Sequence, residues 1–479
     1  MPIKNKTASR SGFLPNLSII LASKAHHLCC KSSDTNMRAK VKGCAARGLS
    51  LRKIVDMLQV AVLRNDPEGV KKRLAKKHVQ NPGLVDTIIE LDDQRKKTQA
   101  EFDAIQAKVN SSSKEIGMLM GKGEKDAAEA LKTQVANWKA ELEPLKTQMA
   151  ETEEQLQQAL VQLPNLPADI VPEGRAAEDN LTVKTGGPQP QLPANAKPHW
   201  DLAKQFNLID FELGNKVTGS GFPFYIGKGA RFQRALIQYF LDFNTQAGYL
   251  EYLPPFMVNE ASGYGTGQLP DKEGQMYHMQ LDNFYMIPTA EVPVTNVYRD
   301  VVLKESDLPV KMTAYSPCFR REAGSYGKDV RGLNRLHQFE KVEIIQMVHP
   351  DQSYTALDEM VAHVEALVAS LELPYRILRL CGGDMSFASA ITYDFEVYSA
   401  AQERWLEVSS VSNFESFQAN RMKCRFKGND GKTQLVHSLN GSSLALPRIY
   451  AALLENHQTD NGIRIPKVLQ PYFGAATIE

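Results

Sequence analysis

The stretch that decides the fold is SPCFRREAGSYGKDVRGLNRLHQFEKVEIIQ, residues 316–346. It opens with an arginine-rich segment at 319–322, passes through a loop at 323–335 that holds three glycines and several basic residues, and returns at 336–345. The returning segment is rich in β-branched and aromatic residues, which are typical of strands. The pattern therefore predicts a hairpin that gathers two arginines, an aromatic ring and a buried carboxylate around one concavity.

These groups are the ones that hold a nucleotide. Guanidinium groups bind phosphate oxygens in bidentate fashion, an aromatic face packs against a base, and a carboxylate binds an ammonium group. The spacing alone predicts a phosphate site, and a basic, solvated loop remains the alternative interpretation at this point.

Composition narrows the class of protein. At 479 residues the chain is too long for one ordinary core, so we expect two or three domains. The 56 basic and 55 acidic side chains nearly balance, which excludes a generally polycationic nucleic-acid binder and leaves RNA contacts to local clusters. The six cysteines lack paired CxxC spacing, which argues against zinc and for a reduced, cytoplasmic compartment. No apolar run approaches the roughly 20 residues that span a bilayer, so we expect no membrane association.

Residues 1–56 differ from the rest of the chain, because they carry eleven Lys or Arg against only Asp34 and Asp56. One interpretation is an organellar transit peptide, since such segments are rich in Arg and Ser and poor in acidic residues. The other, which we favour, is a translated upstream stretch with the working start at Met57. Both interpretations predict a disordered, dispensable extension.

A heptad pattern predicts an antiparallel helical hairpin over 84–163. Seam positions, most of them apolar, alternate in steps of four and three residues on either side of a glycine-containing break at 121–123. They are Leu84, Ile88, Leu91, Arg95, Thr98, Phe102, Ile105, Val109, Ser112, Ile116 and Leu119, then Ala128, Leu131, Val135, Trp138, Leu142, Leu145, Met149, Thr152, Leu156, Ala159 and Leu163. Helices of about 36 residues give an arm of ~54 Å. Pro144 predicts a kink in the second helix, because proline removes a backbone donor. Dimerisation or spacing is the alternative to RNA binding for such an arm.

Proline, glycine and polar residues dominate 164–200, which we interpret as a linker between an arm domain at 57–163 and a second domain at 201–479. In the second domain, strands follow one another without an intervening helix. We therefore expect an α+β fold with a largely antiparallel sheet flanked by helices. The predicted strands are 284–287, 344–348, 391–397 and 404–410, and the predicted helices are 230–247 and 354–371.

Five ordered motifs give roughly 57–474 a family resemblance. FRREAG, RG and HQFEKVE in the central stretch resemble the second signature motif of class II aminoacyl-tRNA synthetases, in the form found in the bacterial-type seryl-tRNA synthetase family. The other motifs, in order, are Leu253-Pro254-Pro255 with YGTGQLP at 264–270, Thr289-Ala290-Glu291-Val292-Pro293, Glu407-Val408-Ser409-Ser410 with Ser412-Asn413-Phe414, and Asn440-Gly441-Ser442 leading to Arg448.

The resemblance implies a serine–tRNA ligase that activates L-serine with ATP and transfers it to tRNA(Ser), with selenocysteine tRNA as a further candidate. It also implies Mg²⁺ but no zinc, and a homodimer formed through the Pro254-Pro255 region. The arm would grip the long variable arm of the tRNA. Candidate phosphate contacts are Lys71, Lys72, Arg73, Lys76 and Lys77 at its base, and Lys96, Lys97, Lys108, Lys132, Lys139 and Lys146 along its shaft.

The same resemblance implies the residues of the site. The serine pocket would consist of Thr289, Glu291, Arg320, Glu343, Asn440 and Ser442. ATP would contact Arg320, Arg321, Glu322, Leu336, Phe339, Glu407, Val408, Ser409, Ser410 and Arg448. The implied catalytic residues are Arg320, Arg448 and Glu407, and the implied Mg²⁺ ligands are Glu407 and Ser410, which supply the hard oxygen atoms that this ion prefers.

The chain departs from the family pattern at Ser443 and Pro447 in the third motif and at Val411 after the Glu407 motif. Proline is tolerated in the first turn of a helix, so we still expect Arg448 to be presented to the site. Nothing in the sequence accounts for Val411.

Two other functions stay open from the sequence. One is a relative that activates an amino acid for a carrier other than tRNA, which an intact arm argues against, since ordering it costs entropy. The other is a coiled-coil RNA-binding protein with a dead catalytic domain. The complete set of Arg320, Glu322, Glu343, Glu407 and Arg448 argues against that second alternative.

Overall fold

The structure is a computed structural model that describes residues 58–271, 274–322 and 331–479. The extension at 1–56 and most of the predicted loop at 323–335 lie outside the described residues, so the expectations for them are untested.

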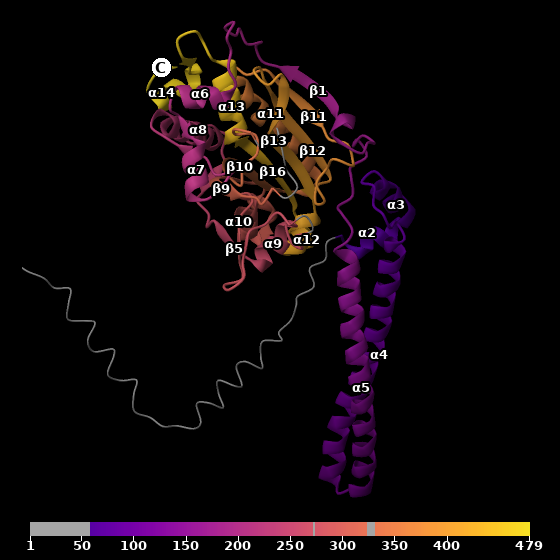
Figure 1. Ribbon diagram of the computed structural model, residues 1–479. Coiled ribbons are helices and arrows are strands. Elements are labelled where there is room, and N and C mark those ends of the chain that lie inside the picture. The colour runs from indigo at the N-terminus through magenta and orange to yellow at the C-terminus, as the bar shows by residue number, and fades with distance from the viewer. Residues whose placement is uncertain (1–57, 272–273, 323–330) are drawn as a thin grey trace, which may run out of the picture. The chain divides into compact units, whose positions relative to one another are not determined.

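The N-terminal part is helical, as the heptad pattern predicts. Two short helices, α2 (Val60–Asn65) and α3 (Pro67–Ala75), precede the long helices α4 (Leu84–Lys122) and α5 (Lys125–Leu160). Figure 1 shows α4 and α5 running side by side. The tight reversal between them is possible because Gly123 adopts a left-handed conformation at φ 83°, where a glycine pays no steric penalty.

The buried side chains of the hairpin confirm the predicted seam. α5 continues without interruption through Pro144, and the kink there remains a prediction. The buried seam residues are Leu84, Ile88, Thr98, Val109 and Ser112 in α4 and Ala128, Val135, Leu142, Thr152, Leu156 and Ala159 in α5.

Three basic side chains at the base of the arm donate hydrogen bonds to main-chain carbonyl groups. Arg73 Nε donates to the carbonyl of Pro167, and Lys76 Nζ donates to that of Asp169, each over 2.8 Å. Lys77 Nζ donates to three carbonyl groups, and burial lowers the pKa of Lys77 to about 7. Each of these side chains already has an intramolecular acceptor, and a contact of Arg73, Lys76 or Lys77 with RNA phosphate stays a prediction. The three carbonyl groups that Lys77 contacts belong to Ser386, Phe387 and Ser389.

The C-terminal part is organised by an eight-stranded sheet, within the described residues. All neighbouring strands are antiparallel except β4 and β9, which confirms the predicted α+β class. In spatial order the strands are β1 (Leu181–Gly186), β11 (Tyr375–Arg379), β12 (Ile391–Ser399), β13 (Arg404–Glu415), β16 (His437–Ala445), β10 (Gln338–Val348), β9 (Val310–Phe319) and β4 (Leu250–Tyr252).

The predicted hairpin is β9 and β10, which pair in register from Phe319 opposite Gln338 to Val310 opposite Met347. On its other side β10 pairs with β16, which places Glu343 opposite Ser442. The strand therefore lies inside the sheet, and successive side chains alternate between the two faces of the sheet.

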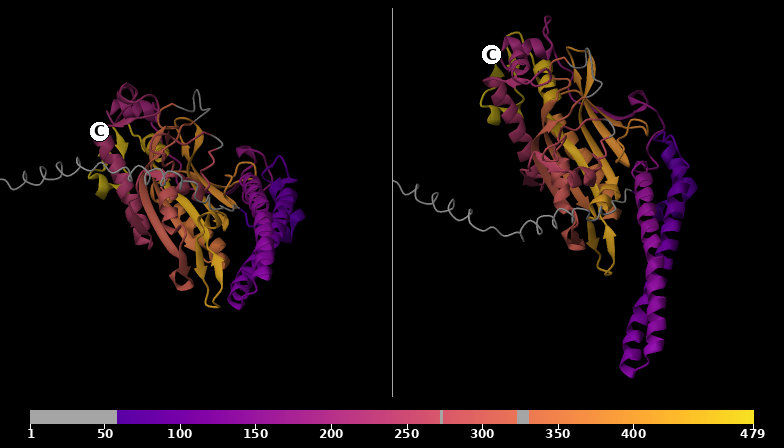
Figure 2. Two further views of the ribbon diagram at one scale, coloured as in Figure 1. Left: turned by 90° about the horizontal axis from the view of Figure 1, so that it is seen from below. Right: turned by 60° about the horizontal axis from the view of Figure 1, so that its bottom comes forward.

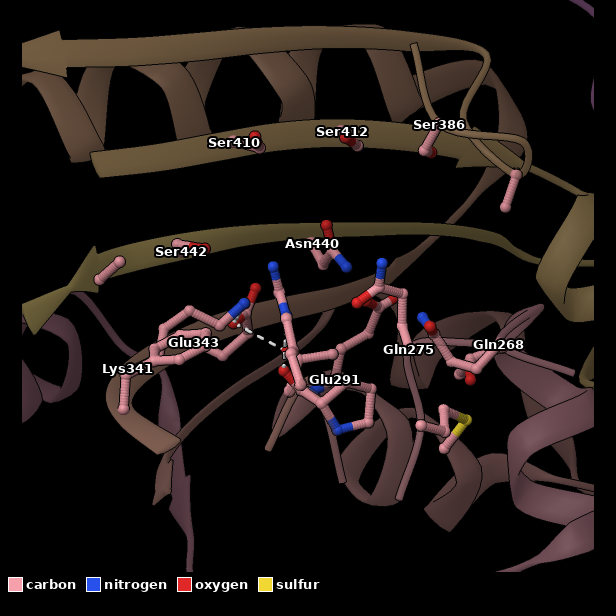
Figure 3. Close-up of a pocket in the computed structure, with 18 of the residues that line it drawn as sticks. Gln268, Gln275, Glu291, Lys341, Glu343, Ser386, Ser410, Ser412, Asn440 and Ser442 are labelled. Carbon is pink, nitrogen blue, oxygen red and sulfur yellow. Dashed lines mark hydrogen bonds and ion pairs between the residues drawn. The ribbon is translucent and has the colours of Figure 1, made fainter. Parts of the chain in front are cut away.

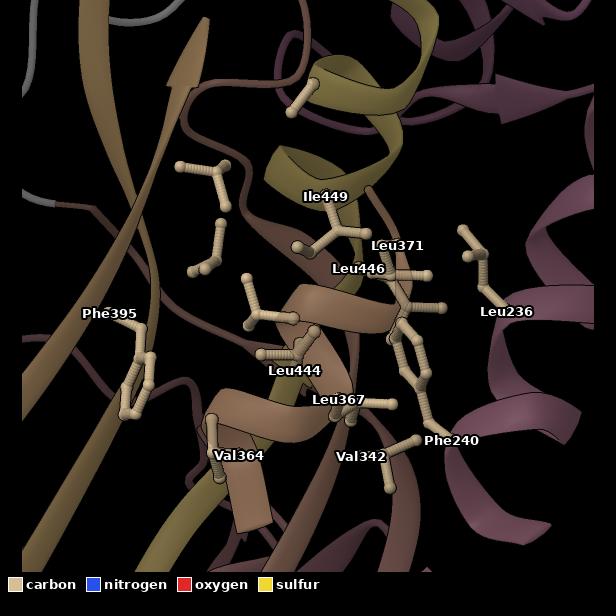
Figure 4. Close-up of a cluster of buried hydrophobic side chains, with 14 of the residues drawn as sticks. Leu236, Phe240, Val342, Val364, Leu367, Leu371, Phe395, Leu444, Leu446 and Ile449 are labelled. Carbon is tan, nitrogen blue, oxygen red and sulfur yellow. The ribbon is translucent and has the colours of Figure 1, made fainter. Parts of the chain in front are cut away.

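One face of the sheet packs on helices and forms the main hydrophobic core. Figure 4 shows Val342 and Leu444 from the sheet against Leu367 and Leu371, with Phe240 beside them. The helices that cover this face are α8 (Lys228–Gln246), α11 (Ser353–Ser370) and α13 (Leu446–Asn456), which carry the apolar spacing typical of helices packed against a sheet.

The remaining elements are short. The helices are α6 (His199–Gln205), α7 (Phe211–Val217), α9 (Glu260–Thr266), α10 (Glu291–Thr295), α12 (Phe417–Met422) and α14 (Gln470–Phe473). The small sheets are β15 (Thr433–Leu435) with β14 (Arg425–Lys427) and β8 (Val302–Lys304), β5 (Met257–Asn259) with β7 (Phe284–Met286) and β6 (His278–Met279), β2 (Ile209–Asp210) with β3 (Phe224–Tyr225), and β17 (Ile463–Arg464) with β18 (Thr477–Ile478).

The segment interpreted as a linker contains regular structure. β1 pairs with β11 at the edge of the large sheet, and α6 begins at His199, whose side chain is fully buried. Figure 2 shows β1 extending the sheet beyond β11. The domain boundaries at 163 and 200 remain predictions, but the chain between them contributes to the large sheet and its core.

Candidate active site

A cavity of about 660 Å³ lies over the face of the large sheet that the helices of the main core leave free. This size suits a small organic ligand. Figure 3 shows its wall: Ser410 and Ser412 lie on one strand, Asn440 and Ser442 on the next, and Glu343 beyond them. The predicted site residues that line the cavity are Thr289, Glu291, Arg320, Glu322, Leu336, Phe339, Glu343, Glu407, Val408, Ser409, Ser410, Asn440, Ser442 and Arg448.

Alternation along the strands explains why residues distant in sequence meet here. On β10, Phe339, Lys341 and Glu343 line the cavity, while Val342 and Ile344 belong to the core on the opposite face. The same alternation on β16 and β13 aims Asn440 with Ser442 and Ser410 with Ser412 toward the cavity. The site is thus assembled by strand pairing.

One end of the cavity is rich in buried charge. Lys341 Nζ lies 2.6 Å from Glu343 Oε2, and both side chains are almost completely buried. Thr289 Oγ1 donates to the same carboxylate oxygen over 3.1 Å. Glu291 lies beside this pair and accepts a hydrogen bond from Gln418 Nε2 over 2.6 Å. Two carboxylates facing one small space form an anionic end that suits an ammonium group.

Burial and the neighbouring Glu343 carboxylate raise the pKa of Glu291 to about 7. Both effects disfavour a second negative charge, although Gln418 and Lys341 partly offset them. Glu291 therefore changes its charge near neutral pH when no cation lies between the two carboxylates.

The other end of the cavity carries the predicted nucleotide groups. The Arg320 guanidinium carbon lies 5.2 Å from the centre of the Phe339 ring, and Leu336 is buried nearby. Glu322 Oε2 accepts a hydrogen bond from Arg335 NH1 over 3.0 Å. Arg321 is not brought into the cavity, because its guanidinium group lies over the ring of Tyr277 at 5.8 Å.

Arg448 is held by two main-chain carbonyl groups. Its Nε donates to the carbonyl of Asn334 over 3.0 Å, and its NH1 donates to that of Glu407 over 2.7 Å. Pro447 lies in the first turn of α13, where a missing N–H costs nothing, so the expectation that Arg448 is still presented to the cavity is confirmed.

A second carboxylate lies close to the predicted metal ligands. Ser410 Oγ donates to Asp394 Oδ1 over 2.6 Å and lies 3.4 Å from Glu407 Oε1. Burial and the proximity of Glu407 raise the pKa of Asp394 well above its ordinary value. Two crowded carboxylates and a hydroxyl are hard oxygen donors that suit a divalent cation. Within 58–271, 274–322 and 331–479, no group of three or more His, Cys, Asp or Glu is arranged to hold a metal.

The departure at Val411 has a packing explanation. Val411 pairs with Gly441 across β13 and β16, and a β-carbon on Gly441 would lie 3.0 Å from Val411 Cγ2. The valine methyl group occupies the space above the glycine and is fully buried in the core. A larger residue at either position would clash with its partner.

Three residues of the site were missed by sequence reasoning. Lys341 stands two residues before Glu343, so strand alternation could have placed both side chains on one face. Asp394 is a carboxylate inside a predicted buried strand, which is a detectable anomaly. Gln418 lies in a six-residue helix and gives no sequence signal.

An antiparallel sheet that carries arginines, an aromatic ring and acidic residues around one adenylate-sized cavity is the core of a class II aminoacyl-tRNA synthetase. Residues 277–457 match the class II core domain of the synthetases for G, H, P, S and T. Residues 57–167 match the seryl-tRNA synthetase N-terminal domain.

The chain belongs to the seryl-tRNA synthetase family. It is 50% identical over 424 residues to a serine–tRNA ligase of Salinibacter ruber, covering 88% of this chain and 99% of the relative. It superimposes on a crystal structure of the Pyrococcus horikoshii seryl-tRNA synthetase complexed with ATP with a TM-score of 0.82 at 32% identity, covering 88% and 99% of the two chains. A crystal structure of the cytoplasmic serine–tRNA ligase of Naegleria fowleri in complex with AMP superimposes with a TM-score of 0.78 at 26% identity. The match covers 88% of this chain and 99% of that chain.

No helix within the described residues has the length and apolarity that a membrane span needs.

The raised pKa of Glu291 predicts that kcat/KM for serine increases with pH near neutrality. Below pH 7 the carboxyl group is mostly protonated and cannot pair with an ammonium group, so kcat/KM for serine should be about tenfold lower at pH 6 than at pH 8. The measurement is serine-dependent exchange of pyrophosphate into ATP across this pH range. Glu291→Gln should abolish the rise, and a flat profile in the unmodified protein would contradict the assignment.

Proposed function

We propose that the protein joins L-serine to tRNA(Ser) in two ATP-dependent steps. A serine carboxylate oxygen attacks the α-phosphorus of ATP, the bond to pyrophosphate breaks, and pyrophosphate leaves with the electron pair. A ribose hydroxyl of the tRNA then attacks the carbonyl carbon of seryl-adenylate, and AMP leaves. The observation that carries the proposal is a single cavity with an anionic end for the amino acid and a guanidinium-rich end for ATP.

The anionic end supports selection of serine. Glu291 and Glu343 would pair with its ammonium group, and Glu343 with Ser442 would hydrogen-bond its hydroxyl group. A site built for a hydroxyl rejects analogues without one by as much as ~10⁴, because its own buried polar groups would lose their partner.

The guanidinium-rich end supports binding of ATP. Both reactants of the first step are anions, so positive charge and alignment matter more than a covalent nucleophile. Arg320 would neutralise the serine carboxylate and the α-phosphate, and Arg448 the β- and γ-phosphates. Phe339 would pack against adenine above Leu336. Glu322 would bind the adenine amino group in place of Arg335, to which it is hydrogen-bonded in the structure.

The helical hairpin is the proposed reader of tRNA(Ser), which the match of 57–167 to the family's N-terminal domain supports. Exposed lysines along the shaft, such as Lys97 and Lys139, are free to contact phosphate, whereas Lys76 and Lys77 at the base already donate to main-chain carbonyl groups. The proposed location is the cytoplasm, in keeping with Cys318, Cys381 and Cys424, which are buried thiols without a disulfide.

The function predicts exchange of pyrophosphate into ATP with serine alone among the twenty amino acids, and charging of tRNA(Ser) by the same preparation. Glu343→Gln should raise KM for serine at least about tenfold, the scale of losing a charge-assisted hydrogen bond, and leave KM for ATP nearly unchanged. Glu340→Gln is the matched control, because that side chain points away from the cavity and contacts Gln233. Exchange without tRNA charging would favour the relative that loads another carrier, and no exchange would favour the dead RNA-binding protein.

Mg²⁺ is the proposed metal, held by Glu407 and Ser410 with Asp394 behind them. Bound to the phosphates of ATP, the ion would neutralise charge that develops on them. The crowded carboxylates support a cation at this position.

Glu407→Gln should therefore weaken binding of Mn²⁺, used as a paramagnetic substitute in the presence of ATP, by about tenfold or more. The measurement is an electron paramagnetic resonance titration. Glu403→Gln, an exposed carboxylate in the same hairpin, serves as the control. Equal binding by the Glu407 variant and the control would remove Glu407 from the metal site.

A homodimer is the proposed assembly. β4 is an edge strand of the large sheet, and apolar side chains follow it on the surface: Leu250 is 63% exposed and Leu253 79%. Phe256 and Met257 continue the same exposed segment. An open strand edge beside apolar side chains is a surface that proteins normally cover, and a second copy of the chain would do so.

Leu253→Asp should therefore convert the protein from a species of twice the 53.4 kDa chain mass to one of a single chain mass. The measurement is sedimentation equilibrium at micromolar concentration. Val217→Asp is the control, since Val217 is 62% exposed on α7 and lies in a different element. A dimer that survives Leu253→Asp would place the interface elsewhere.

A further inference from the structure

Leu333 and Asn334 form part of the cavity wall at the ATP end, and the segment 331–334 is held from behind by α6. Leu333 N donates to His199 Nε2 over 2.9 Å in a completely buried contact. The Arg331 guanidinium carbon lies 4.3 Å from the centre of the Trp200 ring. A β-carbon on Gly332 would lie 2.2 Å from His199 Nε2, which leaves no space for a side chain. Gly332 also has a φ of 66°, a conformation that favours glycine.

The contacts of His199 define its tautomer. Its Nδ1 lies 2.7 Å from Glu455 Oε1, and Glu455 is itself fully buried. A main-chain N–H only donates, so Nε2 must be the acceptor, and the proton is therefore on Nδ1 and points at Glu455. Burial alone would raise the pKa of Glu455, but hydrogen bonds from His199 and Ser399 outweigh burial and lower it. An ionised glutamate thus orients a neutral imidazole, whose free lone pair fixes the backbone of Leu333.

The same carboxylate reaches Asn334 by a second route. Glu455 Oε1 accepts a hydrogen bond from Gln402 Nε2 over 3.2 Å, and Asn334 Nδ2 donates to Gln402 Oε1 over 2.9 Å. The main-chain carbonyl of Asn334 in turn accepts the 3.0 Å hydrogen bond from Arg448 Nε. Figure 1 places α6 beside α13, the helix that supplies both Glu455 and Arg448.

We infer that His199 is a positioning residue for ATP: through Leu333 and Asn334 it fixes the carbonyl group that aims Arg448 at the phosphates. This inference rests on the proposed role of Arg448 toward ATP. Serine binds at the other end of the cavity, among Glu291 and Glu343, so its affinity depends little on this network. A role confined to core stability would instead affect both ligands or neither.

Two substitutions at His199 separate its two hydrogen bonds. The amide oxygen of glutamine reaches the place of Nε2 and keeps the acceptor for Leu333 N, whereas the amide nitrogen of asparagine reaches the place of Nδ1 and keeps only the donor to Glu455. His199→Asn should raise the Kd for ATP, measured by calorimetry on the full chain, about five- to tenfold, the size of one buried hydrogen bond. His199→Gln should stay within about twofold of the unmodified protein, and KM for serine should change less than about twofold in both.

A third variant changes Gly332, which lies against His199, rather than His199 itself. Gly332→Ala forces a β-carbon against His199 and should weaken ATP binding as His199→Asn does. Gly431→Ala is its control, because Gly431 has a similar φ of 81° but faces open space in a distant turn. If the His199 variants do not fold by circular dichroism, the glycine pair decides the question.

The outcomes separate this inference from the proposed function. Equal ATP affinity of His199→Asn and His199→Gln, or parallel loss of ATP and serine, would overturn the positioning role. Equal ATP affinity of Gly332→Ala and Gly431→Ala would also overturn the positioning role. An unmodified protein that binds ATP but supports no serine-dependent exchange would overturn the proposed function, while the ATP series would still test His199.

Discussion

The structure depends on the register of β10 between β9 and β16. With Glu343 opposite Ser442, side chains two residues apart present a ring, an ammonium group and a carboxylate to the cavity, and the intervening side chains fill the core. A slip of one residue would exchange the two faces, burying Lys341 among leucines and exposing Val342 to the ligand. The apolar core therefore specifies the geometry of the site, because only one register satisfies both faces. Conversely, the charges of the site exclude competing registers.

The site concentrates buried negative charge that its own cationic side chains balance only in part. Lys341 neutralises Glu343, whereas, among the residues that the structure describes, the Gln418 amide donates to Glu291 and the Ser410 hydroxyl donates to Asp394, which lies near Glu407. Buried carboxylates without a cationic partner are costly, and their raised pKa values are the measure of that cost. A ligand that supplies cations at both places relieves this cost, so the arrangement of these carboxylates itself contributes to the binding free energy. An amino acid with its ammonium group and a nucleotide with its metal supply cations of this kind.

The features of the fold and of the site that could be predicted from the sequence are those that depend on local residue spacing or on contiguous motifs. The helical hairpin follows from a heptad repeat, and the hairpin of β9 and β10 follows from alternation, so both were recognisable without the structure. The predicted site residues converge on one cavity, with Arg321 the exception because its guanidinium group lies over Tyr277. Gln418 and His199 were not predicted, because each acts through a partner more than one hundred residues away. His199 was also hidden by composition, since it stands at the end of a proline-rich segment that resembles a linker.

At the base of the arm, side chains donate hydrogen bonds to main-chain carbonyl groups, and contacts of this kind do not depend on which residue supplies the carbonyl. Arg73, Lys76 and Lys77 attach α3 and the residues after it to the rest of the chain by donating to peptide oxygens, and Asn165 does the same toward Ala388 and Phe414. Every amino acid supplies that oxygen, so residues 386–389 can mutate without losing the acceptors, provided that the main-chain path is kept. The junction therefore constrains backbone conformation rather than side-chain identity on the acceptor side. The side chains at 386–388 also line the cavity, but the hydrogen bonds themselves restrict length rather than composition, since an insertion would move every acceptor at once.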